Sequence, residues 1–237
     1  MPIPRNPRPP SPNHFLAALP RQVYARMLPH LEVVTLTFKQ VLSEPGEDIQ
    51  HVYFPSKGVI CTIAILADER ITDVGTTGNE GMVGLSQFLG TGLGTNRIMC
   101  QVAGDAQRMT AAAFHAEADR HGTLHDLLLR YTSAVLFRTQ QWVACTAHHT
   151  IAQRCARWLL MTHDRMTADR FPLTQEMLAS MLCVRRLSVS GAASDFQQRG
   201  LIWYSRGAVI IRDRTGLEGA SCECYQRVKD EFERLYN

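Results

Sequence analysis

Basic and hydroxyl side chains gather between positions 185 and 190, where Arg185, Arg186, Ser188 and Ser190 lie close together in the sequence. An Arg side chain can donate two hydrogen bonds to the O6 and N7 acceptors of guanine, and a Ser hydroxyl can bond to a base edge or a phosphate. If these residues begin a helix, they form the kind of surface that enters a DNA major groove. The spacing therefore predicts a base-reading helix.

Two short helices and a hairpin are predicted to position these side chains. Thr174 is a good N-cap for a helix over about 175–182, and a second helix over about 185–198 has apolar residues at i, i+3, i+4 and i+7. Gly200 can end this second helix, and residues 201–211 read as two strands about a tight turn. This is the order of a helix-turn-helix followed by a wing. The candidate DNA contacts are Thr174, Gln175, Arg185, Arg186, Ser188, Ser190 and Arg206.

Charge and composition agree with a DNA-binding part that is separate from the rest of the chain. Residues 154–217 contain ten Arg and five Asp or Glu, so this segment is strongly positive. The whole chain of 237 residues has a formal net charge of only +3. Positive charge gathered in one segment is typical of a DNA binder with a separate sensing part. A hydrophobic content of 45% is enough for one large core or two smaller ones.

The sequence also bears on compartment and cofactors. No apolar run approaches the length of a membrane span and no signal for export precedes the first helix, so we expect a cytoplasmic protein without a membrane partner. The seven Cys are scattered and odd in number, which argues against a disulfide framework. Cys222 and Cys224 could chelate a metal or respond to oxidation, but two thiolates alone make a weak site. No metal site is predicted.

The composition and residue pattern of the rest of the sequence divide the chain into segments. Residues 1–13 are rich in Pro and read as a disordered arm. Residues 14–122 begin with short helices and continue as β-branched runs separated by turns, one of them at 55–58, which predicts a sensor domain built as an antiparallel β-barrel or jelly roll. Residues 123–150 form a long helix. Residues 151–237 hold the winged helix-turn-helix and a final amphipathic helix, so the fold class is α+β.

The long helix carries a heptad pattern. Its apolar positions are spaced alternately by four and three residues, as in helices that pair with one another. We interpret this seam as a dimer interface, because a two-fold protein reads two half-sites; the alternative is a core helix that lies on its own barrel. The seam is formed by Leu124, Leu128, Tyr131, Val135, Arg138, Trp142 and Cys145, of which Leu124, Leu128, Tyr131, Val135 and Trp142 are the candidate interface residues.

The order of barrel, long helix and winged helix-turn-helix resembles the Crp/Fnr family of bacterial transcription regulators. The resemblance covers nearly everything after the N-terminal arm and is most specific at 174–202 and in the loop 78–85. It implies a homodimer with a cyclic-nucleotide-binding-like barrel that senses a signal, and recognition helices that bind a near-palindromic site in double-stranded DNA. It also implies contact with RNA polymerase. Arg186 matches the family's usual base-reading Arg, whereas Leu187 stands where the family has Glu.

Departures from the family bear on the signal. Cyclic-nucleotide-binding members carry Gly-Glu-Leu in the barrel loop and later an Arg-Ser or Arg-Thr pair, and here Gly81-Met82-Val83 and Arg97-Ile98 stand at those places. Glu80, Gly81 and Arg97 remain candidate effector residues, but we expect no cyclic nucleotide. Iron–sulfur members use a run of N-terminal Cys, and this chain has none before Cys61.

Two other classes of function remain open. Jelly-roll metal enzymes need His and carboxylate ligands that converge from strands, whereas the nine His here lie mostly in helical stretches. His121 and His125 could share a helix face, but Gly122 interrupts the start of that helix. An interaction module that dimerises and binds neither ligand nor DNA is the third possibility. We expect no enzyme activity.

Overall fold

The computed structural model of the chain describes residues 9–236, and its first half is built on one antiparallel sheet. The strands are β1 (Glu32–Leu36), β2 (Val41–Ser43), β3 (His51–Ile65), β4 (Ile71–Thr77) and β5 (Arg97–Thr110). Their order is β1-β5-β3-β4, and β2 also pairs with β5. Within the described residues this sheet does not close on itself, so the expected barrel is an open antiparallel variant of that architecture.

The turn predicted at 55–58 is absent, because these residues lie inside β3. The pairing of β3 with β5 shifts register several times between Pro55 and Ile60. Gly58 has a φ of +88°, and a Cβ there would lie 2.6 Å from the carbonyl oxygen of Val102 on β5. Residues typical of a turn therefore produce a bulge that bends one long strand, where the sequence predicted two short strands.

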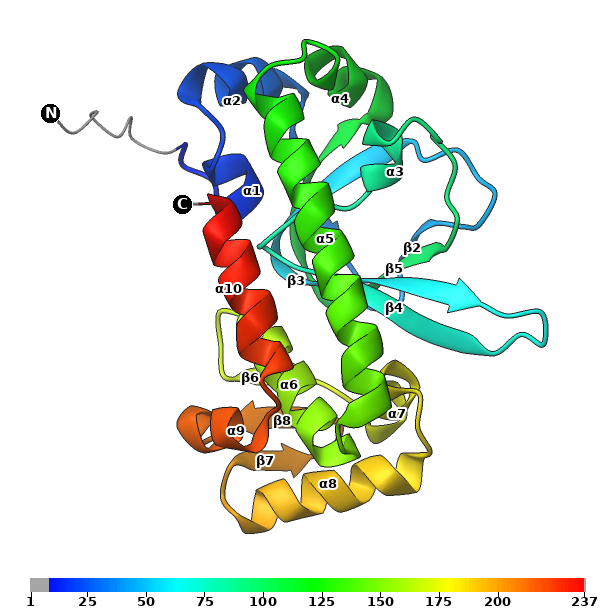
Figure 1. Cartoon of the computed structure of the whole chain (residues 1–237), viewed down its shortest axis with the longest axis vertical. Coiled ribbons are helices and arrows are strands. Elements are labelled where there is room, and N and C mark those ends of the chain that lie inside the picture. The colour runs from blue at the N-terminus through cyan, green and yellow to red at the C-terminus, as the bar shows by residue number, and fades with distance from the viewer. Residues whose placement is uncertain (1–8, 237) are drawn as a thin grey trace, which may run out of the picture.

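Helices cover this sheet and connect it to the second half of the chain. The short ones are α1 (His14–Ala17), α2 (Arg21–Met27), the 3-10 turn η1 (Leu28–His30), α3 (Leu85–Phe88) and α4 (Ala111–Ala118). The long helix α5 (Thr123–His148) passes across the sheet and reaches the second half of the molecule (Figure 1). Its inner face joins a core that includes Phe15 of α1 and Phe54 of β3.

The predicted dimer seam lies on this inner face of α5. Leu124, Leu128 and Tyr131 are 2%, 0% and 1% exposed in the single chain, which leaves them no surface to offer a partner. Val135 and Trp142 are half-buried at its edge. Burial therefore speaks against Leu124, Leu128 and Tyr131 as interface residues, whereas Val135 and Trp142 stay predictions. A heptad spacing describes any helix stripe that packs against a neighbour, including the chain's own sheet.

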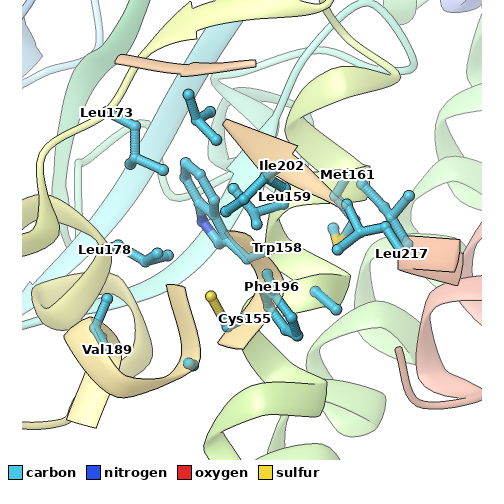
Figure 2. Packing of buried hydrophobic residues seen from close by; sticks show 14 of the residues in the cluster. Cys155, Trp158, Leu159, Met161, Leu173, Leu178, Val189, Phe196, Ile202 and Leu217 are labelled. Atoms are coloured by element: carbon cyan, nitrogen blue, oxygen red, sulfur yellow. The ribbon is translucent and has the colours of Figure 1, made fainter. Parts of the chain in front are cut away.

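The second half contains the winged helix-turn-helix. Its elements are α6 (Ile151–His163), β6 (Arg170–Pro172), α7 (Gln175–Leu182), α8 (Arg186–Gln198), β7 (Ile202–Ser205), β8 (Ala208–Ile211), α9 (Arg214–Ala220) and α10 (Cys224–Tyr236), with the strands ordered β6-β8-β7. Trp158 of α6 packs with Leu178 of α7, and with Phe196 of α8 and Ile202 of β7 (Figure 2). The predicted pair of helices and hairpin is confirmed, whereas α9 was not predicted.

The last helix, α10, belongs to both cores. Tyr225 near its start packs with the helix-turn-helix, whereas Val228, Phe232 and Leu235 are buried in the core of the first half of the chain. The ring of Phe232 lies 6.2 Å from the ring of Tyr131 on α5. Figure 1 shows α10 running beside α5 along much of its length. The two halves are therefore joined by a shared helix as well as by the chain between α5 and α6.

The prediction of a disordered arm over residues 1–13 is wrong for residues 9–13. Residues 1–8 lie outside the described residues. Residues 9–13 are part of the fold, because the buried Nδ2 of Asn13 donates to the carbonyl oxygens of Pro55 and Gly81 at 2.9 and 2.8 Å. The other side-chain atom, Oδ1, accepts from the backbone N–H of Leu16 and caps α1.

In the described part of the chain, no helix combines the length and apolarity that crossing a membrane requires.

Candidate DNA-binding surface and the contacts that orient it

Local capping sets the geometry of the helix-turn-helix. The hydroxyl of Thr174 accepts from the backbone N–H of Met177 at 3.1 Å, as predicted for the start of α7. Cys183 ends α7 with a φ of +53°, and this left-handed residue turns the chain toward α8. Arg185 is the N-cap residue of α8, so Arg186 is the first residue within the helix. The buried Arg154 of α6 donates to the carbonyl oxygen of Leu182, which fixes α7 against α6.

The outer face of α8 is basic, small and open. Arg185 and Arg186 are exposed, and Leu187 beside them is 83% exposed. Ser188 and Ser190 are half-buried, so each presents only part of its surface. The opposite face holds α8 in place through its predicted stripe, which is buried throughout: Val189, Ala192, Ala193 and Phe196. The helix can therefore approach a groove without uncovering its core.

The wing places one further basic residue at the tip of a hairpin. Arg206 is exposed and lies between β7 and β8 with a φ of +49°, next to Gly207 at +74°. The hydroxyl of Tyr204 donates to the carbonyl oxygen of Leu173 at 2.9 Å, and its backbone N–H donates to Gln197 of α8. The hairpin is thus fixed to α8 and to the residue that precedes the N-cap of α7. Gln175, the remaining candidate contact, is half-buried in the first turn of α7.

The first half of the chain contains a cavity of about 280 Å3 between the sheet and α5. Met82, Val83 and Ile98 contribute to its wall, together with Thr77 and the buried Arg138 of α5. None of the described residues that line this cavity is a carboxylate. The loop that carries Met82 and Val83 therefore supplies a mainly apolar wall.

The three candidate effector residues do not line this cavity. Arg97 forms an ion pair with Glu44 at 2.9 Å. Gly81 packs against Tyr131, because a Cβ at this position would collide with the Tyr131 hydroxyl. That hydroxyl bonds to the backbone N–H and carbonyl oxygen of Met82 at 3.0 and 2.9 Å. Gly81 therefore has a packing role.

Glu80 is the centre of a buried ion cluster that the sequence did not reveal. Arg165, which follows α6, donates to its two carboxylate oxygens at 2.6 and 3.0 Å. Arg138 of α5 lies 3.7 Å away and donates to the carbonyl oxygen of Thr76 at 2.7 Å. Burial favours the neutral carboxyl, but the charges of both Arg outweigh it and hold the pKa of Glu80 below its ordinary value.

This ion cluster orients the second half of the chain on the first. Arg165 also donates to the side-chain and backbone oxygens of Thr76 at 2.7 and 3.2 Å, and its stem fills the place where Gly78 lacks a Cβ. Tyr236 at the end of α10 donates to the backbone oxygen of Glu80. A signal for this arrangement was present in the sequence, since Arg138 occupies a position in the apolar seam of α5 and a buried cation needs an anion nearby.

A second buried carboxylate, Asp73 of β4, lies near the same cluster. It accepts from the backbone N–H of Gly75 at 3.0 Å and from the Gln101 amide at 3.1 Å. Burial raises the pKa of Asp73 to about 7, although these hydrogen bonds and the charges of Arg165 and Arg138 act in the opposite direction. Asp73 also lines a cavity of about 420 Å3 between the sheet and α7.

Two further groups of side chains lie on or near α5. Leu129, Leu136 and Val143 are 53%, 57% and 67% exposed, and their spacing of seven residues places them on the side of α5 opposite its core face. Near the end of the helix, four potential metal ligands come together: Cys145, His149, Cys222 and Cys224. Cys145 was predicted as a residue of the seam, and His149 was assigned no role from the sequence.

Comparison with known proteins agrees with this geometry. Residues 153–220 match the Crp-like helix-turn-helix domain. The fold is similar to FixK2 from Bradyrhizobium japonicum, with a TM-score of 0.69 and 15% identity over 81% of this chain and 98% of that one. It is also similar to TTHB099, a CRP-family transcriptional regulator from Thermus thermophilus, with a TM-score of 0.65 and 21% identity over 81% and 99%. No curated protein sequence matches the chain.

A third similar structure is that of a regulator with a named signal. The c-di-GMP responsive global regulator CLP from Xanthomonas campestris has a TM-score of 0.59 and 16% identity over 81% of this chain and 99% of its own. At these identities the likeness shows the fold, which is that of the Crp/Fnr transcription regulators.

The raised pKa of Asp73 predicts a pH-dependent stability. The unfolded carboxyl loses its proton near its ordinary value of 3.8, whereas the folded one keeps it up to about 7. The stabilisation from this proton is complete below the lower value and is lost as the pH rises through the higher one. Each pH unit between them corresponds to about 1.4 kcal/mol, so the total loss is on the order of 4 kcal/mol.

Asp73→Asn should remove this loss, because the amide is neutral at every pH. We expect its free energy of unfolding in urea, relative to wild type, to increase between pH values of about 5 and 8. The matched control is Asp68→Asn, whose side chain is 54% exposed in the wild-type chain; it should follow the wild-type profile. Parallel profiles for Asp73→Asn and wild type would contradict the assignment.

Proposed function

Because residues 153–220 match the Crp-like helix-turn-helix domain and the chain has the fold of the Crp/Fnr transcription regulators, we propose that it is a homodimeric, sequence-specific DNA-binding regulator. Its sensor half, about 14–122, receives a signal, residues 123–150 connect the halves, and residues 151–237 bind a near-palindromic operator. This role is regulatory rather than enzymatic, and it implies a cytoplasmic protein that contacts RNA polymerase.

One observation carries the proposal. The start of α8 exposes Arg185 and Arg186, while the buried stripe on its other face fixes the helix to α6 and α7. Base reading needs donors held in a fixed register, and phosphate contacts need positive charge around them. Arg206 on the wing provides such a charge at a second place. Thr174 and Gln175 at the start of α7 offer backbone and side-chain donors to phosphate.

The proposed dimer uses the outer face of α5. Leu129, Leu136 and Val143 form an apolar stripe with heptad spacing, and each is more than half exposed in the single chain. Two copies of this stripe could pair about a two-fold axis and bury these side chains. The recognition helices of the two protomers would then face successive major grooves on one side of the duplex.

The proposed path of the signal runs through the ion cluster at Glu80. This residue belongs to the sensor loop, Arg138 to the helix of the proposed dimer, and Arg165 to the DNA-binding half. An effector that moved the loop would change the position of Glu80 and so the orientation of the DNA-binding half. The cavity beside the loop has a wall of Met82 and Ile98, which supports an effector other than a cyclic nucleotide.

The first test separates base reading from phosphate binding. Arg186→Ala should cost about 1 to 3 kcal/mol of operator binding and relax the preference at one position of each half-site, because Arg reads guanine with two hydrogen bonds. Arg185→Ala is the matched comparison and should weaken binding to all sequences alike. Selection from a random duplex library measures both effects. An unchanged sequence preference for Arg186→Ala would refute the base-reading role of Arg186. If the wild-type protein shows no salt-dependent binding to duplex DNA, the proposed function is refuted.

A second prediction concerns assembly. Leu136→Glu would place two unpaired charges in the proposed interface, which costs several kcal/mol, so sedimentation should show monomers at micromolar concentration. Arg130→Glu is the control, because Arg130 is also exposed but points to a different side of α5. It should remain dimeric. A Leu136→Glu protein that stays dimeric would show that the partner binds another surface.

The third prediction concerns the signal. At the places that match the family, Met82 offers no acceptor to a ribose hydroxyl and Ile98 offers no hydroxyl to a phosphate. A buried polar group without its partner costs about 1 to 3 kcal/mol, so two lost contacts weaken binding by roughly two to four orders of magnitude. Calorimetric titration with cyclic AMP and cyclic GMP should show no micromolar binding. Micromolar affinity with a matching rise in operator affinity would overturn this expectation.

A further inference from the structure

Three thiols and one imidazole converge where α5 ends and α10 begins. Cys145 and His149 are four residues apart at the end of α5, while Cys222 and Cys224 lie at the start of α10. One potential ligand atom from each of the four lies within 4.8 Å of every other. The three Cys are buried and His149 is half-buried, so the group is largely shielded from solvent.

Two of the distances between these atoms are close to those around one tetrahedral metal ion. The Sγ atoms of Cys145 and Cys222 are 3.5 Å apart, and Sγ of Cys224 is 3.5 Å from Nδ1 of His149. A tetrahedral ion with metal–sulfur bonds of about 2.3 Å and metal–nitrogen bonds of about 2.1 Å separates its ligand atoms by roughly 3.6 to 3.8 Å. An iron–sulfur cluster places several atoms at the centre and would hold its ligands further apart.

Neighbouring groups orient two of the four side chains. Nε2 of His149 lies 3.2 Å from the carboxylate of Glu223, which leaves Nδ1 directed toward Cys224. A carboxylate on the second ring nitrogen is the usual partner of a metal-binding His, because it fixes the tautomer and makes the ligand nitrogen more basic. The amide of Gln141 donates to Sγ of Cys224 at 3.1 Å, which favours the thiolate.

A buried cation also indicates that the group is anionic. Arg157 of α6 is 1% exposed, and its Nε and Nη1 have no hydrogen-bond partner among the described residues. Its guanidinium stacks on Trp142 at 4.7 Å. An uncompensated buried charge is costly. The positive charge of Arg157 acts on both Cys145 and Cys222, so this cation lies beside the group.

We propose that Cys145, His149, Cys222 and Cys224 bind one thiophilic divalent ion of the Zn2+ type. Three thiolates and a neutral imidazole give a zinc complex with a net charge of −1, which Arg157 balances. All four positions are filled by the protein, so the site is structural and has no open position for a substrate. It fastens the end of α5 to the start of α10, and it does not depend on the DNA-binding function.

Metal content tests this site on the full-length protein without any activity assay. Protein purified without chelators should contain about one zinc per chain by mass spectrometry. After zinc removal under reducing conditions, added Co2+ should give the visible bands of a tetrahedral site and thiolate-to-cobalt charge transfer. Zinc should displace the cobalt with a dissociation constant of about 50 nM or tighter.

Variants locate the metal within the chain. Cys222→Ser and His149→Ala should each reduce zinc to a small fraction of one per chain. Cys183→Ser is the matched control, since Cys183 is exposed and lies outside the group, and it should keep its full zinc content. Because a ligand variant can unfold, the cobalt spectrum of the wild-type protein serves as the independent measurement.

Three results would overturn the proposal. The first is a reduced wild-type protein that takes up neither zinc nor cobalt. The second is a full zinc content in both ligand variants. The third is a Cys145–Cys222 disulfide that is already present in the purified protein, resists reduction and excludes the metal.

Discussion

The relative position of the two halves depends on a half-buried carboxylate that lies between two buried guanidinium groups. Glu80 comes from the sensor loop, Arg138 from the connecting helix and Arg165 from the DNA-binding half, so one charge cluster joins the three parts of the chain. Removing either partner of a buried pair leaves an uncompensated charge, which typically costs about 3 to 5 kcal/mol. The ion cluster therefore specifies how the two halves are oriented relative to one another, because few other orientations could satisfy all three groups at once.

The connecting helix α5 serves two surfaces at the same time. Its inner face, which includes Leu128 and Tyr131, is buried in the sensor core. Its outer face carries the exposed side chains of Leu136 and Val143. These faces lie on opposite sides of the helix, so a movement of the sensor loop against the inner face is transmitted to the outer face only by displacement of the helix as a whole. A rigid helix of 26 residues is suited to that task.

Local sequence signals predicted the DNA-binding half well and the contacts between distant segments poorly. The N-cap Thr174, the stripe of α8 and the wing hairpin depend on residues within a few positions of one another, and each was confirmed. The heptad on α5 was real, but periodicity does not state which neighbour a stripe packs against. The pairing of Glu80 with Arg165 and the meeting of Cys145 with Cys222 join segments about 80 residues apart, and spacing along the chain carries no signal for such contacts.

The last helix, α10, contributes side chains to both hydrophobic cores, and this affects how the protein can fold during synthesis. Domains commonly fold as they leave the ribosome, beginning with the N-terminal one. Here Val228, Phe232 and Leu235 complete a core whose other members lie between Phe15 and Ala134. The nascent sensor half must wait, with part of its apolar surface uncovered, until residues 224–236 have emerged from the exit tunnel. The DNA-binding half is then already made, so both halves reach their final state together and the chain becomes a regulator only when its last helix docks.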